Sequence, residues 1–309
     1  MIRADGVVGL TLRGVDDELP KWTPGAHIDV VLPSGRCRQY SLCGPVTSAD
    51  YEIAVRYEAG GRGGSREVHK SLVPGSVVEI SAPRNRFPLE RAESYLFVAG
   101  GIGITPILPM IEAVDGLGLE WRLVYCGRSR ATMPFCDELE LYDDRVQLWP
   151  DDERGQLDVP ALVGTAVAAE PGVAVYTCGP GPLIEAMDRA VRDVGAAPLR
   201  YERFVAAPVA EPAPGGVAAS ACEVQLGVDG PVIAVREDQS ILQAVLDAGA
   251  DVLFSCEEGS CGSCQTTVLA GEVDHRDDLL TEAERADRQM LICVSRGTQG
   301  RLVLDIEAP

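Results

Sequence analysis

Three cysteines crowd one short loop near the end of the sequence, and a fourth stands alone further along. Cys256, Cys261 and Cys264 are separated by four and two residues, and Cys293 follows after a long gap. A two-iron, two-sulfur cluster needs four thiolates that converge on one inorganic core, and this spacing is one by which proteins hold such a cluster. The sequence therefore predicts a 2Fe–2S cluster and single-electron transfer.

The other residues of the loop favour the same centre. Gly259 and Gly262 allow a positive φ and a close backbone approach, so the chain can wrap a compact core. Backbone N–H groups and the hydroxyls of Ser260 and Ser263 can donate to the sulfurs. A tetrahedral zinc site and unrelated buried thiols are the alternatives. Zinc sites usually pair two short Cys-x2-Cys knuckles, which this arrangement lacks, so the cluster is the favoured interpretation.

Charge and composition restrict the partners. The chain of 309 residues carries 27 Lys and Arg against 47 Asp and Glu, a net charge of −20. Such a balance argues against nucleic acid or an anionic membrane surface. The apolar stretch Leu96–Val114 is interrupted by glycines and prolines, which favours a buried strand, a glycine turn and a helix start over a membrane span. Ten cysteines and no visible secretory signal indicate a reducing compartment, and we expect a cytoplasmic monomer.

The pattern of apolar and turn-forming residues changes along the chain and predicts three domains. Residues 1–92 contain short β runs separated by Pro and Gly turns, typical of a small antiparallel barrel: Ile28–Leu32, Tyr51–Tyr57 and Ser76–Ile80. Residues 93–205 alternate apolar strands with helical patterns, which predicts an α/β domain with an open parallel sheet. Residues 206–221, rich in Pro, Ala and Gly, are expected to be a linker. Residues 222–309 are expected to form a compact α+β unit around the cluster loop, with a helix over Ser240–Ala248 and a last strand over Leu302–Ile306.

Two strings in the first domain suit a flavin phosphate and ring. Gly63, Gly64 and Ser65 precede a helix predicted over Glu67–Leu72, and free N–H groups at a helix N-terminus bind phosphate. In the string Arg38-Gln39-Tyr40-Ser41-Leu42, the arginine can add a charge-assisted contact, the tyrosine a stacking face and the serine a donor. The alternatives are a flexible turn and an exposed strand.

Two turns in the second domain suit a dinucleotide. Gly100, Gly101, Gly103 and Thr105 stand between a strand and a helix that begins near Pro106, where glycines let a pyrophosphate approach the helix. The string lacks the third glycine of the Gly-x-Gly-x-x-Gly fingerprint. Cys178, Gly179 and Pro180 end a later strand, where ligands of open α/β sheets gather. For Cys178 the alternative is a buried thiol.

A third loop bears on the choice of coenzyme. Arg128, Ser129 and Arg130 follow the strand Trp121–Tyr125, and arginines there can accommodate a 2′-phosphate, which favours NADPH. The remaining cysteines have no metal-like spacing and are interpreted as packing residues, and no histidine is proposed as a catalytic base: Cys37, Cys43, Cys126, Cys136, Cys222, His27, His69 and His275.

The ordered set of motifs resembles a known family. Arg-x-Tyr-Ser-Leu-Cys, Gly-Arg-Gly-Gly-Ser, Pro-Arg-Asn-x-Phe-Pro, Ala-Gly-Gly-Ile-Gly-Ile-Thr-Pro, Thr-Cys-Gly-Pro and a C-terminal plant-type ferredoxin loop occur in this order. Together they resemble the phthalate dioxygenase reductase and vanillate demethylase reductase family over essentially the whole chain. The resemblance implies an FMN-binding antiparallel β-barrel, an NAD(P)H-binding α/β domain and a β-grasp ferredoxin domain.

The resemblance also implies roles for residues. Arg38, Gly63, Gly64 and Ser65 would hold the FMN phosphate, while Tyr40, Ser41, Leu42 and Val55 would lie at the flavin. Gly100, Gly101, Gly103 and Thr105 would hold the dinucleotide phosphates, with Arg128 and Ser129 near the adenosine. Cys178, Gly179 and Pro180 would lie beside the nicotinamide, and Phe204 near the flavin, so that Cys178, Ser41 and Phe204 border the reacting atoms.

The resemblance implies that the protein takes a hydride, which carries two electrons, from NAD(P)H and passes these electrons on one at a time. The implied acceptor is the oxygenase component of a Rieske-type aromatic hydroxylating or demethylating system. A haem monooxygenase is the alternative acceptor, and a redox-sensing or permanently docked electron-transfer subunit is an alternative of another class. Family resemblance favours NADH, whereas the arginines near Ser129 favour NADPH, so we expect use of both.

Overall fold

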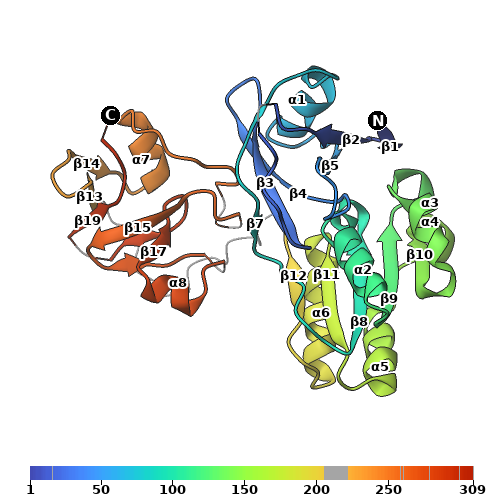
Figure 1. Ribbon diagram of the computed structural model, residues 1–309. Coiled ribbons are helices and arrows are strands. Elements are labelled where there is room, and N and C mark those ends of the chain that lie inside the picture. Colours follow the sequence, from blue (N-terminus) through green and yellow to red (C-terminus); the bar gives the residue numbers. More distant parts are fainter. Residues whose placement is uncertain are drawn as a thin grey trace. The chain divides into compact units, whose positions relative to one another are not determined.

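The structure of the protein is a computed structural model, which describes residues 1–15, 17–204, 222–257, 259, 261–277, 279–298 and 300–308. The chain divides into two compact units, Met1–Phe204 and Val205–Pro309 (Figure 1). The linker predicted over residues 206–221 lies outside the described residues, as do Glu258 and Ser260 of the cluster loop.

The first part of unit 1 is the predicted antiparallel barrel. Its elements are β1 (Ile2–Ala4), β2 (Val7–Leu12), β3 (Ala26–Val31), β4 (Cys37–Ser41), β5 (Tyr51–Arg56), α1 (Gly64–Ser71), β6 (Glu79–Ile80) and β7 (Arg84–Asn85). One sheet has the order β1-β2-β5 and the other β4-β3-β6, with β7 also paired to β3. An isolated bridge between Leu42 and Ile53 joins the end of β4 to β5, and buried apolar side chains from both sheets fill the interior.

One predicted strand of the barrel is too long. Only β6, the last two residues of the range Ser76–Ile80, pairs with β3. Ser76 N instead donates to Val73 O at 2.9 Å in a turn, and Val77 is 78 % exposed. The β-branched composition of this run predicted a strand, but the run has no neighbouring strand at its first half, so pairing stops there.

The second part of unit 1 is the predicted parallel sheet, in the order β10-β9-β8-β11-β12. Its strands are β8 (Ser94–Gly100), β9 (Glu120–Gly127), β10 (Val146–Pro150), β11 (Ala174–Cys178) and β12 (Arg200–Glu202). Its helices are α2 (Ile107–Gly116), α3 (Cys136–Leu139), α4 (Asp151–Arg154), α5 (Val159–Ala169) and α6 (Gly181–Asp193), with the 3-10 turns η1 (Gly101–Ile104), η2 (Arg130–Thr132) and η3 (Glu140–Arg145). The strand order reverses between β8 and β11, so the ends of these two strands form the crevice where open sheets bind ligands.

Both faces of this sheet are covered, which explains the continuous apolar run of β8. Successive side chains of a strand point to opposite faces. Tyr95 and Phe97 pack in one core with side chains of α2, whereas Leu96 and Val98 pack in another with α5 and α6 (Figure 1). The apolar stretch Leu96–Val114 is therefore strand, turn and helix. Among the described residues no helix has both the length and the apolar character needed to cross a membrane.

Unit 2 has the α+β architecture expected for a ferredoxin domain. Its elements are β13 (Cys222–Leu226), β14 (Val232–Val235), α7 (Ile241–Asp247), β15 (Gln265–Ala270), β16 (Val273–Asp274), α8 (Glu282–Ala286), β17 (Gln289–Leu291), β18 (Arg296–Gly297) and β19 (Arg301–Leu304). The main sheet has the order β14-β13-β19-β15-β17, in which β13 and β19 are parallel and the other neighbours antiparallel. Ile241 and Val245 of α7 are buried in the core of this unit.

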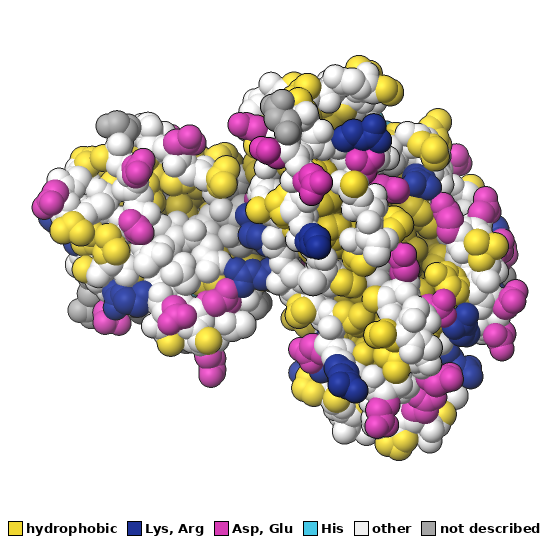
Figure 2. Space-filling model, in the orientation of Figure 1, with side chains coloured by type: hydrophobic (Ala, Val, Ile, Leu, Met, Phe, Trp, Pro, Cys, Tyr) yellow, Lys and Arg dark blue, Asp and Glu magenta, His cyan; other side chains and the backbone are white. Residues whose placement is uncertain are grey.

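The excess of acidic residues lies on the outside. Figure 2 shows Asp and Glu side chains on the visible surface of both units, among apolar and uncharged groups. From Cys222 to Pro309 the sequence has 17 Asp and Glu against 6 Lys and Arg, a net charge of −11. Residues 222–309 therefore carry more than half of the net charge in under a third of the chain.

Candidate functional site

The structure brings the four cysteines of the predicted cluster site together in unit 2. Cys256, Cys261, Cys264 and Cys293 are 9 %, 6 %, 4 % and 7 % exposed. Hydrogen bonds join the thiol of Cys293 to those of Cys256 and Cys264, and the thiol of Cys261 to that of Cys256. These contacts link all four sulfurs into one group. A donor set of four converging cysteine sulfurs fits a 2Fe–2S cluster.

The backbone of the loop has the conformation that this wrapping requires. Glu257, Gly259 and Gly262 adopt positive φ angles of 59°, 74° and 75°. A Cβ atom at Gly259 would stand 2.8 Å from Cγ2 of Val294, so this position needs glycine both for its conformation and for space. The backbone N atoms of Cys256 and Ser263 lie 3.4 and 3.5 Å from the sulfur of Cys261. The loop thus aims N–H groups at a ligand sulfur, as iron–sulfur sites do.

In the barrel, an arginine lies across the beginning of α1. Gly63 caps this helix with φ 89°, a left-handed conformation. A Cβ atom at Gly64 would lie 2.6 Å from Nε of Arg38, so the helix start and the Arg38 side chain are in close contact. Ser65 Oγ accepts a hydrogen bond from Glu58 N at 3.0 Å, which fixes the preceding loop. Free N–H groups of a helix start beside a guanidinium group are the donors that a phosphate needs.

The other predicted flavin residues lie on β4, just after it, or on β5. Tyr40 is half-buried, and burial raises its pKa to about 12, so the phenol stays neutral. Leu42 and Val55 are 0 % and 2 % exposed, and their side chains belong to the core of the barrel. The carbonyl of Val55 accepts from His69 Nε2 at 2.8 Å. Tyr40 is thus better placed than Leu42 and Val55 for side-chain contact with a flavin, whereas Ser41 is 6 % exposed and its hydroxyl donates to Glu202.

The two predicted dinucleotide turns pack against each other at the ends of β8 and β11. A Cβ atom at Gly100 would lie 2.6 Å from Cδ of Pro180, and one at Gly103 would lie 2.3 Å from the carbonyl oxygen of Cys178. At Gly179 it would lie 3.0 Å from Cα of Gly100. These glycines therefore have a packing role, because the two turns approach each other more closely than a side chain would allow. The resulting cradle at the strand ends fits a dinucleotide.

The rest of this loop is ordered by its own hydrogen bonds. Thr105 is 2 % exposed, and its hydroxyl donates to Ile102 O at 2.9 Å. Gly101 has φ 57°, and a Cβ there would be 3.7 Å from a terminal nitrogen of Arg56, which comes from the barrel. Arg56 is a cation at the dinucleotide loop that sequence reasoning missed, because it ends a strand in another domain.

Cys178 is fully buried in unit 1. Its exposure is 0 %, and burial raises the pKa of its thiol well above the ordinary value. It is a neutral thiol at the end of β11, next to the glycine turns. Phe204, which follows β12 by two residues, is 42 % exposed.

The coenzyme loop after β9 is engaged with acidic neighbours. Arg130 forms an ion pair with Glu140. Ser129 Oγ lies 3.3 Å from Thr132 Oγ1, and the carbonyl of Arg128 accepts from Asp152 N at 3.2 Å. Arg128 is exposed, while Arg130 already has a carboxylate partner. The loop therefore offers a 2′-phosphate less positive charge than its sequence indicates.

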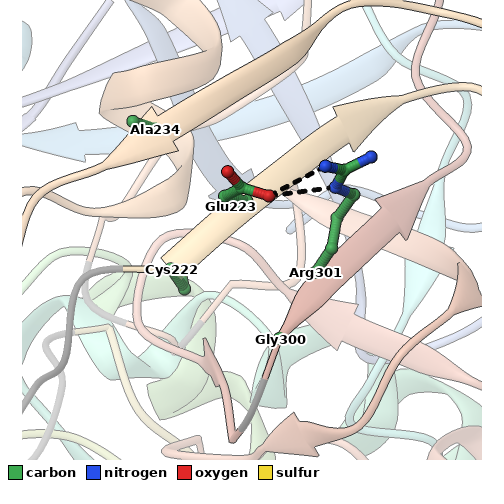
Figure 3. A pocket seen from close by; sticks show the side chains of 5 residues that line it. All are labelled: Cys222, Glu223, Ala234, Gly300 and Arg301. Atoms are coloured by element: carbon green, nitrogen blue, oxygen red, sulfur yellow. Dashed lines mark hydrogen bonds and ion pairs between the residues drawn. The ribbon is translucent and has the colours of Figure 1, made fainter.

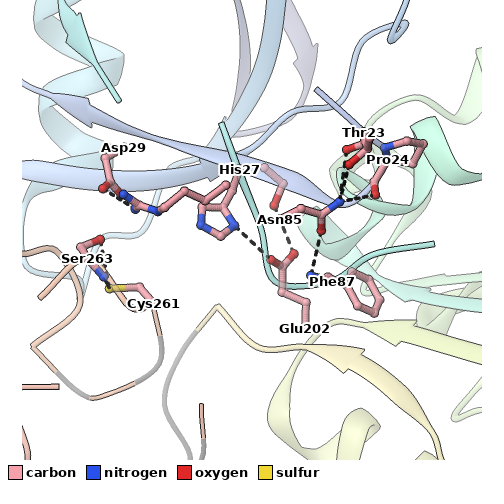
Figure 4. Close-up of polar contacts among 11 residues, drawn as sticks. Thr23, Pro24, His27, Asp29, Asn85, Phe87, Glu202, Cys261 and Ser263 are labelled. Carbon is pink, nitrogen blue, oxygen red and sulfur yellow. Dashed lines mark hydrogen bonds and ion pairs between the residues drawn. The ribbon is translucent and has the colours of Figure 1, made fainter. Parts of the chain in front are cut away.

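A buried carboxyl that sequence reasoning missed lies between the barrel and the parallel sheet. Glu202 of β12 has a side chain 12 % exposed, and burial raises its pKa to about 8. Ser41 Oγ donates to Glu202 Oε2 at 3.3 Å. His27 Nδ1 lies 3.9 Å from Oε1 of Glu202 (Figure 4). His27 and Ser41 are cross-strand partners on β3 and β4. A carboxyl that stays protonated near neutral pH can donate a hydrogen bond, which a carboxylate cannot.

Comparison with known proteins identifies the family. The model of the 2Fe–2S iron-sulfur cluster binding domain matches residues 226–298. The vanillate O-demethylase oxidoreductase of a Pseudomonas strain is 40 % identical over 312 residues, which cover 99 % of this chain and 93 % of that protein. The chain belongs to the phthalate dioxygenase reductase and vanillate demethylase reductase family. The solved phthalate dioxygenase reductase, described as a modular structure for electron transfer from pyridine nucleotides to a 2Fe–2S centre, is 34 % identical with a TM-score of 0.70, over 98 % of this chain and 94 % of that one.

A second solved structure shares the whole arrangement as part of a longer chain. An intact type IV self-sufficient cytochrome P450 monooxygenase is 39 % identical with a TM-score of 0.83, over 98 % of this chain but only 40 % of that one. The chain thus spans less than half the length of this P450 protein, whereas it spans nearly all of the stand-alone reductases.

Family membership confirms the predicted fold class, cofactors and activity. This reductase uses FMN, NAD(P)H and a 2Fe–2S cluster and transfers electrons in an oxygenase system. When bound, the flavin takes up a hydride from the nicotinamide and the cluster carries single electrons. In the chain itself, Arg38 lies at the start of α1, Tyr40 is half-buried on β4, and two backbone N–H groups point at the sulfur of Cys261.

Proposed function

We propose that this reductase supplies electrons from a nicotinamide dinucleotide to the terminal oxygenase of a Rieske-type aromatic hydroxylating or demethylating system. The observation that carries the proposal is the nearly complete mutual coverage with the vanillate O-demethylase oxidoreductase.

The proposed site assignments follow the geometry of unit 1. Arg38 and the start of α1, with Gly63, Gly64 and Ser65, hold the FMN phosphate. Gly100, Gly101, Gly103 and Thr105 form the pyrophosphate loop, and Cys178, Gly179 and Pro180 form the opposite wall beside the nicotinamide. Tyr40 and Ser41 face the flavin ring, and Phe204 borders it. Cys256, Cys261, Cys264 and Cys293 hold the cluster in unit 2.

Reconstitution tests the proposed acceptor. The purified reductase, NADH and a purified Rieske oxygenase are mixed with an aromatic methoxy or carboxylic acid substrate, and product is counted per NADH consumed. We expect product formation near one per NADH, and loss of product with a Cys293→Ala reductase that still reduces ferricyanide. If product forms only with the native reductase, neither free flavin nor peroxide can have driven the oxygenase reaction.

The similarity to the P450 chain favours a haem monooxygenase as the second candidate acceptor. The same reductase is mixed with a P450 haem protein of comparable concentration, and the ferrous carbon monoxide spectrum is followed. Reduction of the haem protein much faster than of the Rieske oxygenase would overturn the first proposal in favour of the second.

A further inference from the structure

A fully buried carboxylate, Asp277, lies beside the cluster-binding segments of unit 2 and is paired with Arg285, whose side chain is 36 % exposed. Asp277 stands between β16 and α8, and its side chain is 0 % exposed. Oδ2 of Asp277 lies 3.5 Å from the guanidinium group of Arg285, which also donates to the Asp277 carbonyl at 2.6 Å. A buried charge persists only when it is paired and hydrogen-bonded, so this arrangement is specific.

The side chain of Asp277 lies close to both segments that supply the cluster ligands. On one side, the Cβ position of Gly259, in the loop with three of the cysteines, lies 3.5 Å from Cβ of Asp277. On the other side, Ser295 donates from Oγ to Asp277 Oδ1 at 3.3 Å, two residues beyond Cys293. Ser295 is 0 % exposed. Asp277 therefore lies where the two ligand-bearing segments meet.

A further hydrogen bond fixes the carboxylate itself. Leu280 N donates to Asp277 Oδ2 at 2.9 Å, and Leu280 is buried in the core that also contains Cys264 and Cys293. His275 Nδ1 is 3.8 Å from Oδ1. These contacts hold the side chain of Asp277 in one conformation beside the cluster loop.

We propose that Asp277 and Arg285 are positioning residues that set the reduction potential of the 2Fe–2S cluster. Reduction adds a negative charge to the cluster, and potentials of iron–sulfur centres depend on the net charge and hydrogen bonds around them. The charge of the fully buried Asp277 is screened much less than an exposed charge, whereas that of Arg285, 36 % exposed, is screened to an intermediate degree. The Asp277 carboxylate opposes reduction and the Arg285 guanidinium group favours it, and together they hold the potential at an intermediate value.

The test measures the midpoint potential of the cluster in the full-length, cofactor-loaded protein by dye-mediated titration. Asp277→Asn keeps the shape of the side chain and removes its negative charge, so the potential should rise. Arg285→Gln leaves the carboxylate without its cation, so the potential should fall. A merely structural role would not give shifts of opposite sign.

Glu223 provides a matched control in the same unit. Its carboxylate pairs with Arg301 at 2.9 Å, and the two side chains are 56 % and 46 % exposed on neighbouring strands β13 and β19 (Figure 3). Glu223→Gln removes the same formal charge as Asp277→Asn, yet water and salt screen it, so the potential should stay at the native value.

The potentials of the three variants distinguish the proposal from its alternatives. Shifts of opposite sign in Asp277→Asn and Arg285→Gln, with no shift in Glu223→Gln, support the proposal. Potentials equal to the control, or shifted in the same direction, overturn it. If Asp277→Asn retains less than a full complement of iron, Arg285→Gln decides alone: a lower potential supports the proposal and an unchanged one overturns it.

Discussion

Nδ1 of His27 lies 3.9 Å from Oε1 of Glu202 in the interior of unit 1, where the two side chains are 2 % and 12 % exposed. Burial, followed by the positive charge of Arg84, lowers the pKa of His27 to about 4, while Asp29 raises it and Arg86 lowers it further. Burial raises the pKa of Glu202 to about 8, against a smaller lowering by the hydrogen bond from Ser41. Both groups are therefore neutral near pH 7, and the contact is between two uncharged side chains.

This relationship predicts how stability depends on pH. The raised pKa of Glu202 means that the folded protein binds the extra proton, so its contribution is lost as pH rises from about 4.5 to about 8. The lowered pKa of His27 means that its contribution is lost as pH falls from about 6.5 to about 4. The two contributions change with pH in opposite directions, so they cancel where the ranges overlap, between about pH 4.5 and pH 6.5. Above about pH 6.5 only Glu202 acts, and unit 1 should lose about 1.4 kcal/mol of stability per pH unit.

Glu202→Gln should remove that loss between pH 6.5 and pH 8. Denaturant unfolding of unit 1, followed by flavin fluorescence at several pH values, measures it. Glu185→Gln is the control, because Glu185 is 55 % exposed and pairs loosely with Arg203 at 3.8 Å. An identical pH slope in the native protein and in Glu202→Gln would contradict the assignment of the titrating group.

The contact between Arg38 and Gly64 predicts a flavin-binding defect without removal of any charge. Gly64→Ala places a Cβ 2.6 Å from Nε and 2.8 Å from Cγ of Arg38, so the arginine must leave the helix start. FMN should dissociate more readily, as in Arg38→Ala, where the lost charge-assisted bond costs about 1.5 to 3 kcal/mol.

Gly60→Ala is the matched control, because nothing lies within 4 Å of its Cβ position. Flavin content after gel filtration and the Kd for FMN give the comparison, and mass spectrometry of the released cofactor identifies it. Equal retention in Gly64→Ala and Gly60→Ala would place the phosphate elsewhere, and released FAD would refute the assignment of FMN.

The contacts among the four thiols predict which reactions need the cluster. Alanine at Cys256, Cys261, Cys264 or Cys293 should abolish cytochrome c reduction and leave NADH-dependent ferricyanide reduction largely intact, because the flavin alone can reduce ferricyanide. Cys222→Ala is the control from the same unit, since Cys222 is half-exposed and begins β13. Cytochrome c reduction that survives the ligand variants, or bound zinc in place of iron, would contradict the cluster assignment.

The sequence predicts the parts of this protein that local chemistry determines. The cysteine spacing predicts the cluster loop, because the ligands and the glycines that bend it are close in sequence. The alternation of buried strands and helices likewise predicts the parallel sheet, since both faces of β8 are covered. The string Gly63-Gly64-Ser65 predicts a helix start, although α1 begins at Gly64 rather than at Glu67.

What the sequence does not predict depends on contacts between distant segments. Glu202 reads as one charge among several in Tyr201-Glu202-Arg203, yet its strand pairs with β11 and turns it inward. Tyr201 is 44 % exposed, and successive side chains of a strand point to opposite faces. The alternation along β12 was therefore the one signal in the sequence that Glu202 points inward. The ion pair of Arg130 with Glu140 joins a loop to η3 and removes a charge that the sequence assigned to a 2′-phosphate.

That ion pair predicts a shift in coenzyme preference. Glu140→Gln frees the guanidinium group of Arg130 and should raise kcat/KM for NADPH relative to NADH. Arg128→Ala combined with Arg130→Ala should lower the same ratio. Steady-state ferricyanide reduction with both coenzymes measures it, and Glu138→Gln, which loses an ion pair with Arg3 instead, is the control. If none of these substitutions alters the ratio of kcat/KM for NADPH to that for NADH, the loop has no part in coenzyme recognition.

The acidic surface of unit 2 predicts how the acceptor docks. Residues 222–309 carry a net charge of −11, the cluster site adds negative charge, and Glu257 and Glu258 lie within the ligand loop itself. Charges there would steer a basic patch of the acceptor to the shortest electron path. Association should slow as salt rises, because the Debye length falls from about 10 Å at 0.1 M to about 3 Å at 1 M. Stopped-flow reduction of the acceptor measures the second-order rate.

Two double variants separate local steering from overall charge. Glu257→Gln with Glu258→Gln should slow association at low salt and flatten its salt dependence. Glu237→Gln with Asp238→Asn removes the same charge from an exposed turn of unit 2. If steering acts at the cluster, the first pair should have the larger effect, since the field of a charge beyond a Debye length is screened. Equal effects would mean that only the total charge of the unit matters, and a rate that ignores both salt and substitution would exclude electrostatic docking.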